Sequence, residues 1–480
     1  MRESEYNLLK CQQYNKIRKN VLRYATGGVM MILKNILNYP WGLERRASMR
    51  LNKIRIGGFR NISDTVVELN NMVALVSLNS YGKSNLLQAI DFGVDFIKNP
   101  VERKKRMMSW IKGIPLTKSI ASKDFEIEFE MQTAIDNVTY NVIYGYRFMW
   151  VRDDDTGARI VGEWLKVKLD DKNQKYNQYI NRTEDNSFYK TSETGRCSNK
   201  ISIEPNELII NKLKAYDGLF YSEVIRKINN LSIHVERHLD ASSSYRPDPF
   251  IRTDMEVLEV DDSANIPRVI FHLKKQFPDK YELLISSFMQ LFPQITDITV
   301  EGLTFVHSGK TQIPQDIPFK VTNQLYVINV TDKNLNQPIN FESMSDGAKR
   351  VFLLLACILL ADINGLSLIA IEEPENSIHP SLLQSYLRVI SQFLGECKVI
   401  ITSHSPFILQ YLELSSIYIG LPNPDGVARF SKVRQSMQKA LINEASNVDM
   451  SVGYYIFDLL SGSENDIVEL SRFLENDFYE

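Results

Sequence analysis

The sequence is poor in cysteine and has no long apolar run. Four cysteines occur among 480 residues and show no metal-ligand spacing, which favours a reducing compartment. No stretch approaches the roughly 18 apolar residues of a membrane-spanning helix, and the short apolar run at residues 29–37 is interrupted by Lys34. We therefore expect a cytoplasmic protein without a membrane span or a secretory signal.

Two further absences narrow the class of protein. No heptad pattern lasts for three or four repeats, which excludes a long coiled coil. Charge is balanced, with a net charge of −2, so the overall charge does not favour wrapping of DNA but is compatible with a local basic surface. With 44% hydrophobic and 24% charged residues, the chain has the composition of a globular protein with a large core.

A phosphate-binding loop is the first motif present. Residues 73–76 predict a short buried strand, residues 85–90 predict the start of a helix, and the turn between them reads Ser77-Leu-Asn-Ser-Tyr-Gly-Lys-Ser84. Backbone N–H groups and the helix dipole favour a phosphate at such a turn. Lys83 would reach the β and γ phosphates, and Ser84 would place its hydroxyl on Mg²⁺. The expected nucleotide-binding residues of the loop are Ser77, Asn79, Ser80, Gly82, Lys83, Ser84 and Asn85.

A second motif places acidic residues at the end of a strand. Residues 366–371 are mostly apolar and lead into Glu372-Glu-Pro-Glu375, a pattern typical of a central parallel strand that delivers carboxylates to a ligand crevice. Glu372 would hold the Mg²⁺ shell, and Glu373 would orient or deprotonate the attacking water. The alternative is an acidic cluster at a helix N-terminus, because Glu375 precedes a helix start signal at His379-Pro380.

A third segment lies before a strongly apolar helix predicted at residues 351–360. Ser345 stands at the start of this helix, where a small hydroxyl and free N–H groups can touch an anion, and Gly347 permits a close backbone approach. The simple interpretation of Ser345 is a helix N-cap.

A histidine ends the fourth segment. Residues 398–403 predict a buried strand, and a helix over residues 381–393 precedes it. This helix and the returning strand would bring His404 beside the acidic strand end, at the same edge of the sheet. There His404 could sense the γ phosphate and serve the reaction together with Glu373 and Lys83.

Taken together, these motifs resemble the RecF/SMC/OLD branch of ABC ATPases over residues 49 to about 419, and their wording resembles OLD-type and bacterial anti-phage ATPases. The resemblance implies an α/β fold: an ABC/RecF-like P-loop ATPase head with a long α+β insertion between the Walker A loop and the signature motif. It implies ATP and Mg²⁺ as cofactors. It also implies that Ser345 and Gly347 cap the γ phosphate held by a second subunit, so that the ATP site is complete only in a head-to-head dimer or an assembly built from such dimers.

Three departures from the family pattern bear on how fast ATP is hydrolysed. Ser77 replaces the first glycine of the loop, Met344 stands where the signature motif usually begins with Leu, and Gln132 is only a candidate for the Q-loop glutamine. Slow hydrolysis is compatible with these departures.

The distance in sequence between Lys83 and Glu372 predicts that an insertion divides the head. We expect an N-terminal extension (1–48), the first half of the head (49–152), an insertion or lid with hairpins and helices (153–337), the second half of the head (338–440) and an acidic C-terminal tail (441–480). The insertion carries a helical pattern over residues 266–291 that is broken near Pro278.

The two ends of the chain each leave two interpretations open. Residues 1–48 are either an upstream-start artefact or an arm that binds a partner. The tail has Ile467, Leu470 and Leu474 on one helical face, which suits docking against a partner and equally a solvated terminal helix.

Nuclease motifs are missing from the sequence. No apolar strand that ends in an acid and precedes a D-x-D pair follows His404, as a Toprim nuclease would require, and no HNH pattern occurs. The pair His234 and His238 lacks the rest of a metal site and fits a strand or helix surface better. We therefore expect ATPase activity but no nuclease activity from this chain alone.

The resemblance implies an ATPase subunit of a two-component anti-phage system of the Septu type, similar to PtuA, in which the ATP-bound dimer controls a separately encoded nuclease of the HNH type. A PARIS-type ATPase with a Toprim nuclease partner is an alternative. A second alternative is a RecF-like, ATP-gated DNA-binding clamp in repair, for which Arg103-Lys-Lys-Arg106 beside Trp110 would contact DNA phosphates.

Overall fold

The fold was analysed in a computed structural model that describes residues 49–475, apart from residues 116, 153–155, 172, 217, 237–244, 247–249, 253–264, 305–318, 377 and 424. The predicted N-terminal extension, residues 1–48, lies outside the described residues, and so does His238. No helix in these ranges is long and apolar enough to cross a membrane.

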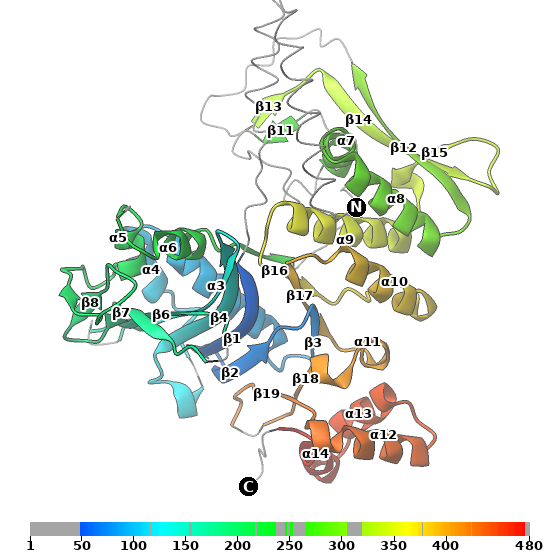
Figure 1. The fold of residues 1–480 in the computed structure, drawn as a ribbon. Helices are drawn as coiled ribbons and strands as arrows, with labels where there is room; N and C mark the ends of the chain where they lie inside the picture. The colour runs from blue at the N-terminus through cyan, green and yellow to red at the C-terminus, as the bar shows by residue number, and fades with distance from the viewer. Residues whose placement is uncertain are drawn as a thin grey trace, which may run out of the picture. The chain divides into compact units, whose positions relative to one another are not determined.

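A central, mostly parallel sheet organises the described chain (Figure 1). Its strands, in spatial order, are β10 (Ile233–Glu236), β16 (Leu368–Glu372), β17 (Lys398–Ser403), β3 (Met72–Ser77), β18 (Ile417–Gly420) and β19 (Phe430–Lys432), and only the last pair is antiparallel. Both faces of this sheet are covered. Met72, Ala74 and Val76 of β3 enter one hydrophobic core, whereas Val73 and Leu75 enter the other. This explains the continuous apolar run, which is typical of a parallel strand buried on both sides.

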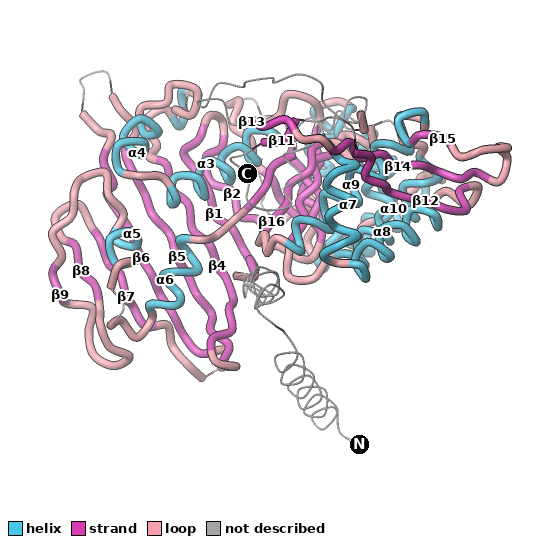
Figure 2. The backbone as a smooth tube through the Cα atoms, turned by 90° about the horizontal axis from the view of Figure 1, so that it is seen from above, coloured by secondary structure: helices cyan, strands magenta, loops and turns pink. Residues whose placement is uncertain are grey.

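An antiparallel sheet shares a hydrophobic core with one face of the central sheet, and Figure 2 shows its strands side by side. Its strands, in spatial order, are β2 (Ile62–Glu68), β1 (Arg50–Phe59), β4 (Phe125–Ile135), β5 (Val138–Met149), β6 (Arg159–Leu169), β7 (Asn177–Arg182), β8 (Ser187–Tyr189) and β9 (Asn199–Lys200). Helix α3 (Lys83–Lys98) packs against it, and Phe96 stacks on Tyr146 and Phe148 at 5.1 and 5.0 Å between ring centroids. The helix that begins at the phosphate loop is therefore anchored in a large aromatic core.

The segment predicted as an insertion contributes strands to both sheets. Strands β6 to β9 continue the antiparallel sheet, with Tyr144 of β5 opposite Leu165 of β6, and β10 pairs with β16 in the central sheet. The boundary predicted at residue 153 thus falls between two neighbouring strands of one sheet. A short polar loop has the same sequence character whether it separates two domains or joins two strands of one sheet.

Helices and a small sheet cover the other face of the central sheet. The larger helices there are α7 (Ile266–Gln276), α8 (Pro278–Leu291), α9 (Asp346–Ile363), α10 (Pro380–Phe393) and α11 (Pro406–Tyr411). The break predicted near Pro278 is confirmed, because proline is tolerated in the first turn of α8 but cannot continue α7. The α/β fold class predicted from the sequence is confirmed.

The small sheets are β11 (Phe250–Arg252) with β13 (Phe319–Val321), and β12 (Ile295–Thr304) with β14 (Gln324–Asp332) and β15 (Ile339–Asn340).

The C-terminal helices pack on the chain's own core. They are α12 (Gln438–Asn447), α13 (Val452–Ser461) and α14 (Glu464–Ser471). Leu470 and Leu474 are fully buried, and Ile467 packs against the same core. Both interpretations of this apolar face are therefore wrong: it is neither solvated nor free for a partner, because this chain itself covers it.

The basic segment that was considered for DNA contact is only partly at the surface. It lies in α4 (Val101–Met108), a short helix like α5 (Ile209–Leu213) and α6 (Ser222–Asn229). In α4, Lys104 is buried and donates to Asn211 Oδ1 at 2.7 Å, and burial lowers its pKa to about 8. Arg103, Lys105 and Arg106 are exposed. Lys104 is therefore not part of an exposed basic patch, because its ammonium group binds Asn211 on α5.

A buried carboxylate lies under α5. Glu163 on β6 is fully buried and accepts hydrogen bonds from the backbone N–H groups of Ile209 and Ile210, at 2.6 and 2.9 Å, and from the Tyr144 hydroxyl at 3.2 Å. Burial raises its pKa to about 7, although these hydrogen bonds oppose the rise. The ionised form of Glu163 therefore costs free energy in the folded state.

We predict that Glu163 makes the folded protein less stable as the pH rises. The pKa of Glu163 in the folded state is about 7, above the ordinary value of 4.5. The protonated Glu163 therefore contributes its full stabilisation below pH 4.5, and this stabilisation is lost as the pH rises through about 7. The loss in free energy of unfolding should be about 3 kcal/mol. Thermal unfolding of wild type and Glu163→Gln across this pH range measures it. Parallel pH dependences of the two proteins would contradict the prediction.

Candidate active site

The phosphate loop joins the end of β3 to the start of α3. Gly82, just before α3, has a φ of 129°, and a Cβ placed there would lie 2.7 Å from the Cβ of Ala428, so this position requires glycine. Asn79 and Ser80 are exposed at the tip of the loop. The first N–H groups of α3 therefore stand behind an exposed turn, which is the arrangement that binds phosphate.

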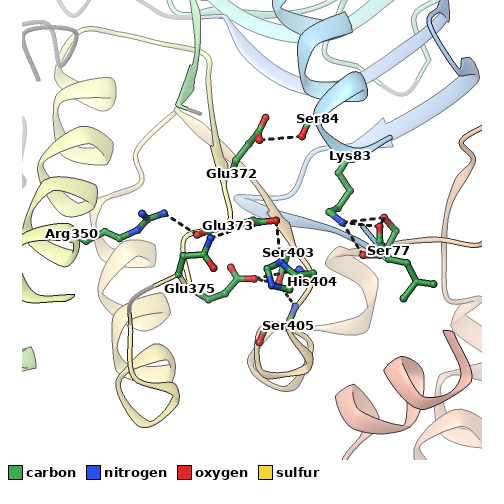
Figure 3. A network of polar contacts seen from close by, with 12 residues as sticks. Ser77, Lys83, Ser84, Arg350, Glu372, Glu373, Glu375, Ser403, His404 and Ser405 are labelled. Atoms are coloured by element: carbon green, nitrogen blue, oxygen red, sulfur yellow. Dashed lines mark hydrogen bonds and ion pairs between the residues drawn. The ribbon is translucent and has the colours of Figure 1, made fainter. Parts of the chain in front are cut away.

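Lys83 lies in the loop that it was predicted to serve (Figure 3). Its ammonium group is buried and donates to the carbonyl oxygens of Ser77 and Leu78, at 2.8 and 3.1 Å. Burial lowers its pKa, and the nearby carboxylates of Glu373, Glu375 and Glu372 oppose this effect. Lys83 therefore lies between the loop carbonyls and a cluster of acidic residues, where a phosphate would offer it a further anionic partner.

Ser77 fits the position where the motif usually has glycine. It ends β3 as a fully buried residue, outside the left-handed region of φ, and its hydroxyl donates to Leu78 O at 3.1 Å. An ordinary backbone conformation carries no requirement for glycine. The departure at Ser77 is therefore accommodated without strain.

Ser84 and Glu372 meet at the place expected for the metal. The Ser84 hydroxyl donates to Glu372 Oε2 at 3.1 Å, and the second carboxylate oxygen of Glu372, Oε1, is buried without a hydrogen-bond partner among the described residues. A buried carboxylate oxygen costs free energy unless a hydrogen bond or a cation satisfies it. Mg²⁺ bound to nucleotide phosphates takes few protein ligands, so one hydroxyl and one carboxylate fit this ion.

Glu373 and His404 are in direct contact. His404 Nδ1 lies 3.0 Å from Glu373 Oε1, and the Asn376 side chain donates to Glu373 Oε2 at 2.8 Å (Figure 3). Burial acts to raise the pKa of Glu373, but the Asn376 hydrogen bond, His404 and Lys83 outweigh it, so the pKa is lowered. The carboxylate is thus ionised near neutral pH and able to accept a proton from water.

Glu375 holds the turn that carries His404. It accepts hydrogen bonds from the Ser403 hydroxyl at 2.5 Å and from the His404 N–H at 3.4 Å, and burial raises its pKa. Helix α10 begins only at Pro380, with His379 as its N-cap. The alternative of an acidic cluster at a helix N-terminus is therefore wrong for Glu375, because its carboxylate bonds to the turn after β17.

Two predicted residues have local partners. Asn85 is bonded to Asn61 Oδ1 at 2.8 Å and accepts from Arg60 at 2.7 Å, so the turn between β1 and β2 holds the first turn of α3. Ser345 Oγ accepts from the N–H of Ala348 at 3.3 Å, which confirms the simple interpretation of an N-cap, here for α9. Gly347 lies in the first turn of the same helix.

Two side chains noted in the sequence lie on strands and have polar partners there. Gln132, the candidate Q-loop residue, lies on β4 and donates to Asp170 Oδ2 at 3.0 Å. His234 lies on β10, 3.2 Å from Glu236, as expected for a strand residue. Among the residues that the structure describes, no group of three or more His, Cys, Asp or Glu side chains forms a metal site.

Sequence reasoning missed several residues of the site: Arg60, Asn61, Arg350 and Asn376. Arg60 and Asn61 directly follow β1 and have polar side chains suited to a tight turn, which was the available signal. Arg350 had no such signal, since its partner is the backbone of Glu373, to which it donates at 3.1 Å.

A family model described as "AAA domain, putative AbiEii toxin, Type IV TA system" matches residues 74–410. No curated protein matches the chain. Among solved structures, an SMC head bound to the C-terminal winged-helix domain of ScpA is 13% identical, with a TM-score of 0.44, and the alignment covers 82% of this chain and 99% of that chain.

Two further solved structures are similar at the same level. The SMC head domain from Thermotoga maritima is 12% identical, with a TM-score of 0.39, and the alignment covers 80% of this chain and 100% of that chain. A Smc head domain with an extended coiled coil, bound to the C-terminal domain of ScpA derived from Pyrococcus furiosus, is 13% identical, with a TM-score of 0.42 and coverage of 83% and 100%.

The environment of Glu372 predicts a dependence on Mg²⁺. Glu372→Gln removes the negative charge of this carboxylate, so the Mg²⁺ concentration needed for half-maximal binding of a fluorescent ATP analogue should rise about 10- to 100-fold. Glu396→Gln is the matched control, because Glu396 is exposed and precedes β17 at the opposite end of the strand from His404. An unchanged Mg²⁺ requirement in Glu372→Gln would refute the assignment.

Proposed function

This chain belongs to the AAA-domain family whose model matches residues 74–410, and on that premise we propose that it binds ATP with Mg²⁺ and hydrolyses it at the edge of the central sheet. The observation that carries the proposal is the convergence of Lys83 with the acidic strand end. The charges of Glu373 and Glu372 act on the pKa of Lys83, and Glu373 contacts His404.

Each side chain has a separate role in this reaction. Lys83 and the N-terminus of α3 bind the phosphates, and Ser84 and Glu372 would hold Mg²⁺, which when bound neutralises phosphate charge. Glu373 accepts a proton from the attacking water, since its lowered pKa keeps the carboxylate ionised. His404 orients that carboxylate through its 3.0 Å contact and would also contact the γ phosphate of bound ATP.

The second part of the proposal is a head-to-head dimer around ATP. Ser345 and Asp346 are exposed at the N-terminus of α9, and Gly347 keeps the backbone of this turn open to close approach. The Ser345 oxygen accepts the capping hydrogen bond, which leaves its hydroxyl hydrogen to donate to an anion. A γ phosphate bound to a second copy of the chain would suit this helix N-terminus.

The third part concerns biological role. We place the chain in the cytoplasm, as the ATPase subunit of a Septu-like anti-phage system that controls a separately encoded nuclease, with the HNH type favoured. The support is the resemblance of its motifs to bacterial anti-phage ATPases and the family description, which names a toxin of a type IV toxin–antitoxin system. Robust DNA nicking by the purified chain alone would overturn this assignment.

The general-base role of Glu373 predicts a trapped complex. Glu373→Gln should lower the rate of ATP hydrolysis by about 100-fold or more while ATP still binds, because only proton acceptance is lost. Size-exclusion chromatography with light scattering should then show an even-numbered assembly stabilised by ATP and Mg²⁺. The neighbouring gene's product, added to the same sample, should co-elute if it is the nuclease partner.

The control for trapping is Lys83→Ala, which should bind no ATP and show no ATP-dependent assembly. If Glu373→Gln hydrolyses ATP at the wild-type rate, Glu373 is not the base. An assembly that responds to DNA and ignores any protein partner would favour the RecF-like clamp.

The proposed role of Ser345 predicts that a substitution there blocks ATP-dependent dimerisation without affecting ATP binding. Ser345→Arg places a bulky cation at the α9 N-terminus, so the chain should keep its affinity for ATP but should not form the ATP-dependent dimer. Equilibrium binding of a fluorescent ATP analogue and light scattering measure the two effects. Ser345→Thr keeps the capping hydroxyl and serves as the control. Normal dimerisation of Ser345→Arg would exclude α9 from the interface.

A further inference from the structure

The side chain of Arg350 connects helix α9 to the end of β16. Arg350, in the second turn of α9, is half-buried, and its Nη2 donates to the backbone carbonyl of Glu373 at 3.1 Å (Figure 3). Ser345 caps the N-terminus of the same helix, in the segment proposed to meet the γ phosphate of a second copy. Arg350 therefore lies between the proposed dimer contact and the proposed general base.

The backbone of Glu373 is held in a conformation that needs support. Its φ is +47°, in the left-handed region, which costs about 1 kcal/mol or more for a residue other than glycine. Its N–H donates to Thr402 O at 3.0 Å on β17, and its carbonyl accepts from Arg350 on α9. These two bonds tie the peptide units on either side of Glu373 to different elements.

The direction of the Glu373 side chain follows from this backbone. Side-chain rotamers depend on φ and ψ, so a rotation of the Glu373 peptide would carry the carboxylate away from His404 and Asn376. An acceptor for the proton of the attacking water must keep near in-line geometry, and a displacement of about 1 Å can cost about 100-fold in rate. The bond from Arg350 thus acts on orientation, at a distance from the reacting atoms.

Arg350 also has other polar groups within electrostatic reach. The buried hydroxyl of Tyr386 interacts with the charges of both Arg350 and Glu375. Among the described residues, the Tyr386 hydroxyl and Glu375 Oε2 are buried atoms without a hydrogen-bond partner. Arg350 and Glu375 therefore both act electrostatically on the Tyr386 hydroxyl, beside the strand end that carries Glu373.

We propose that Arg350 is a positioning residue that couples the placement of α9 to the orientation of the Glu373 carboxylate. When the N-terminus of α9 docks on a γ phosphate, Arg350 holds the Glu373 carbonyl and the carboxylate points at the attacking water. The inference rests on the proposed function, because it requires that Glu373 serve ATP hydrolysis.

Steady-state ATP hydrolysis by the full chain tests the proposal. Arg350→Ala should lower kcat about 10- to 100-fold and change KM by less than about 3-fold. Arg350→Lys keeps the charge and one donor, so it should recover part of the lost kcat. Arg388→Ala is the matched control, because Arg388 is an exposed arginine on the neighbouring helix α10, and its kcat should equal that of wild type.

A double-mutant cycle separates positioning from a general structural role. If Arg350 acts through Glu373, adding Arg350→Ala to Glu373→Gln should lower the single-turnover rate no further. A residue that only supports packing would add its own loss to that of Glu373→Gln, and this additive outcome would overturn the proposal. Melting temperatures confirm folding of each variant, and Arg350→Lys replaces Arg350→Ala in the cycle if the latter does not fold.

The outcomes for Arg350 and for the proposed function can be told apart. If wild type hydrolyses ATP and Arg350→Ala has the same kcat as Arg388→Ala, the positioning role is wrong and the ATPase assignment stands. If wild type with Mg²⁺ hydrolyses no ATP, either alone or with its partner, both are overturned.

Discussion

The candidate site depends on the parallel pairing of three strands, β3, β16 and β17. Thr402 on the middle strand lies opposite both Glu372 of β16 and Leu75 of β3, so the three strands end at one edge. Because parallel strands present their carboxyl ends on the same side, the phosphate loop, the acidic residues and His404 leave the sheet together. A one-residue slip in this pairing would turn every side chain of a strand to the other face and dismantle the site.

The environment assigns different chemistry to neighbouring carboxylates. Burial raises the pKa of Glu375, whereas Glu373 has a lowered pKa because Asn376, His404 and Lys83 outweigh its burial. Glu375 accordingly bonds to the turn after β17, and Glu373 is the proposed proton acceptor. Environments that push the pKa values of adjacent acids apart are a common means of dividing roles within one site.

Helix α9 joins the proposed dimer contact at Ser345 to the proposed general base, Glu373, through Arg350. Its sequence is almost entirely apolar after the first turns, and residues from 351 to 361 are buried against the central sheet and α10. A close-packed core has low compressibility and transmits strain. Ser345 caps α9 and Arg350 lies in its second turn, so strain from a contact at Ser345 would reach Arg350.

Sequence determined the elements and the identity of the motifs. Apolar runs predicted the buried strands that became β3 and β17, and the helix start signal at Ser345 predicted α9. These succeed because backbone propensity, capping and hydrophobic periodicity act over a few residues. Ser84, Glu372, Glu373 and His404 could be named for the same reason, since each stands at a fixed offset from its strand or helix.

The tertiary structure alone decided which distant groups meet. The pairing of β10 with β16, the burial of Lys104, and the bond from Arg350 to the Glu373 carbonyl join residues that are far apart in sequence. A backbone carbonyl is present at every position and leaves no mark in the sequence, so nothing local could identify it as the partner of Arg350. Such contacts form only when the helices and strands pack into the complete core. A sequence pattern shows which residues share one face of a single helix or strand, and does not show which other element packs against that face.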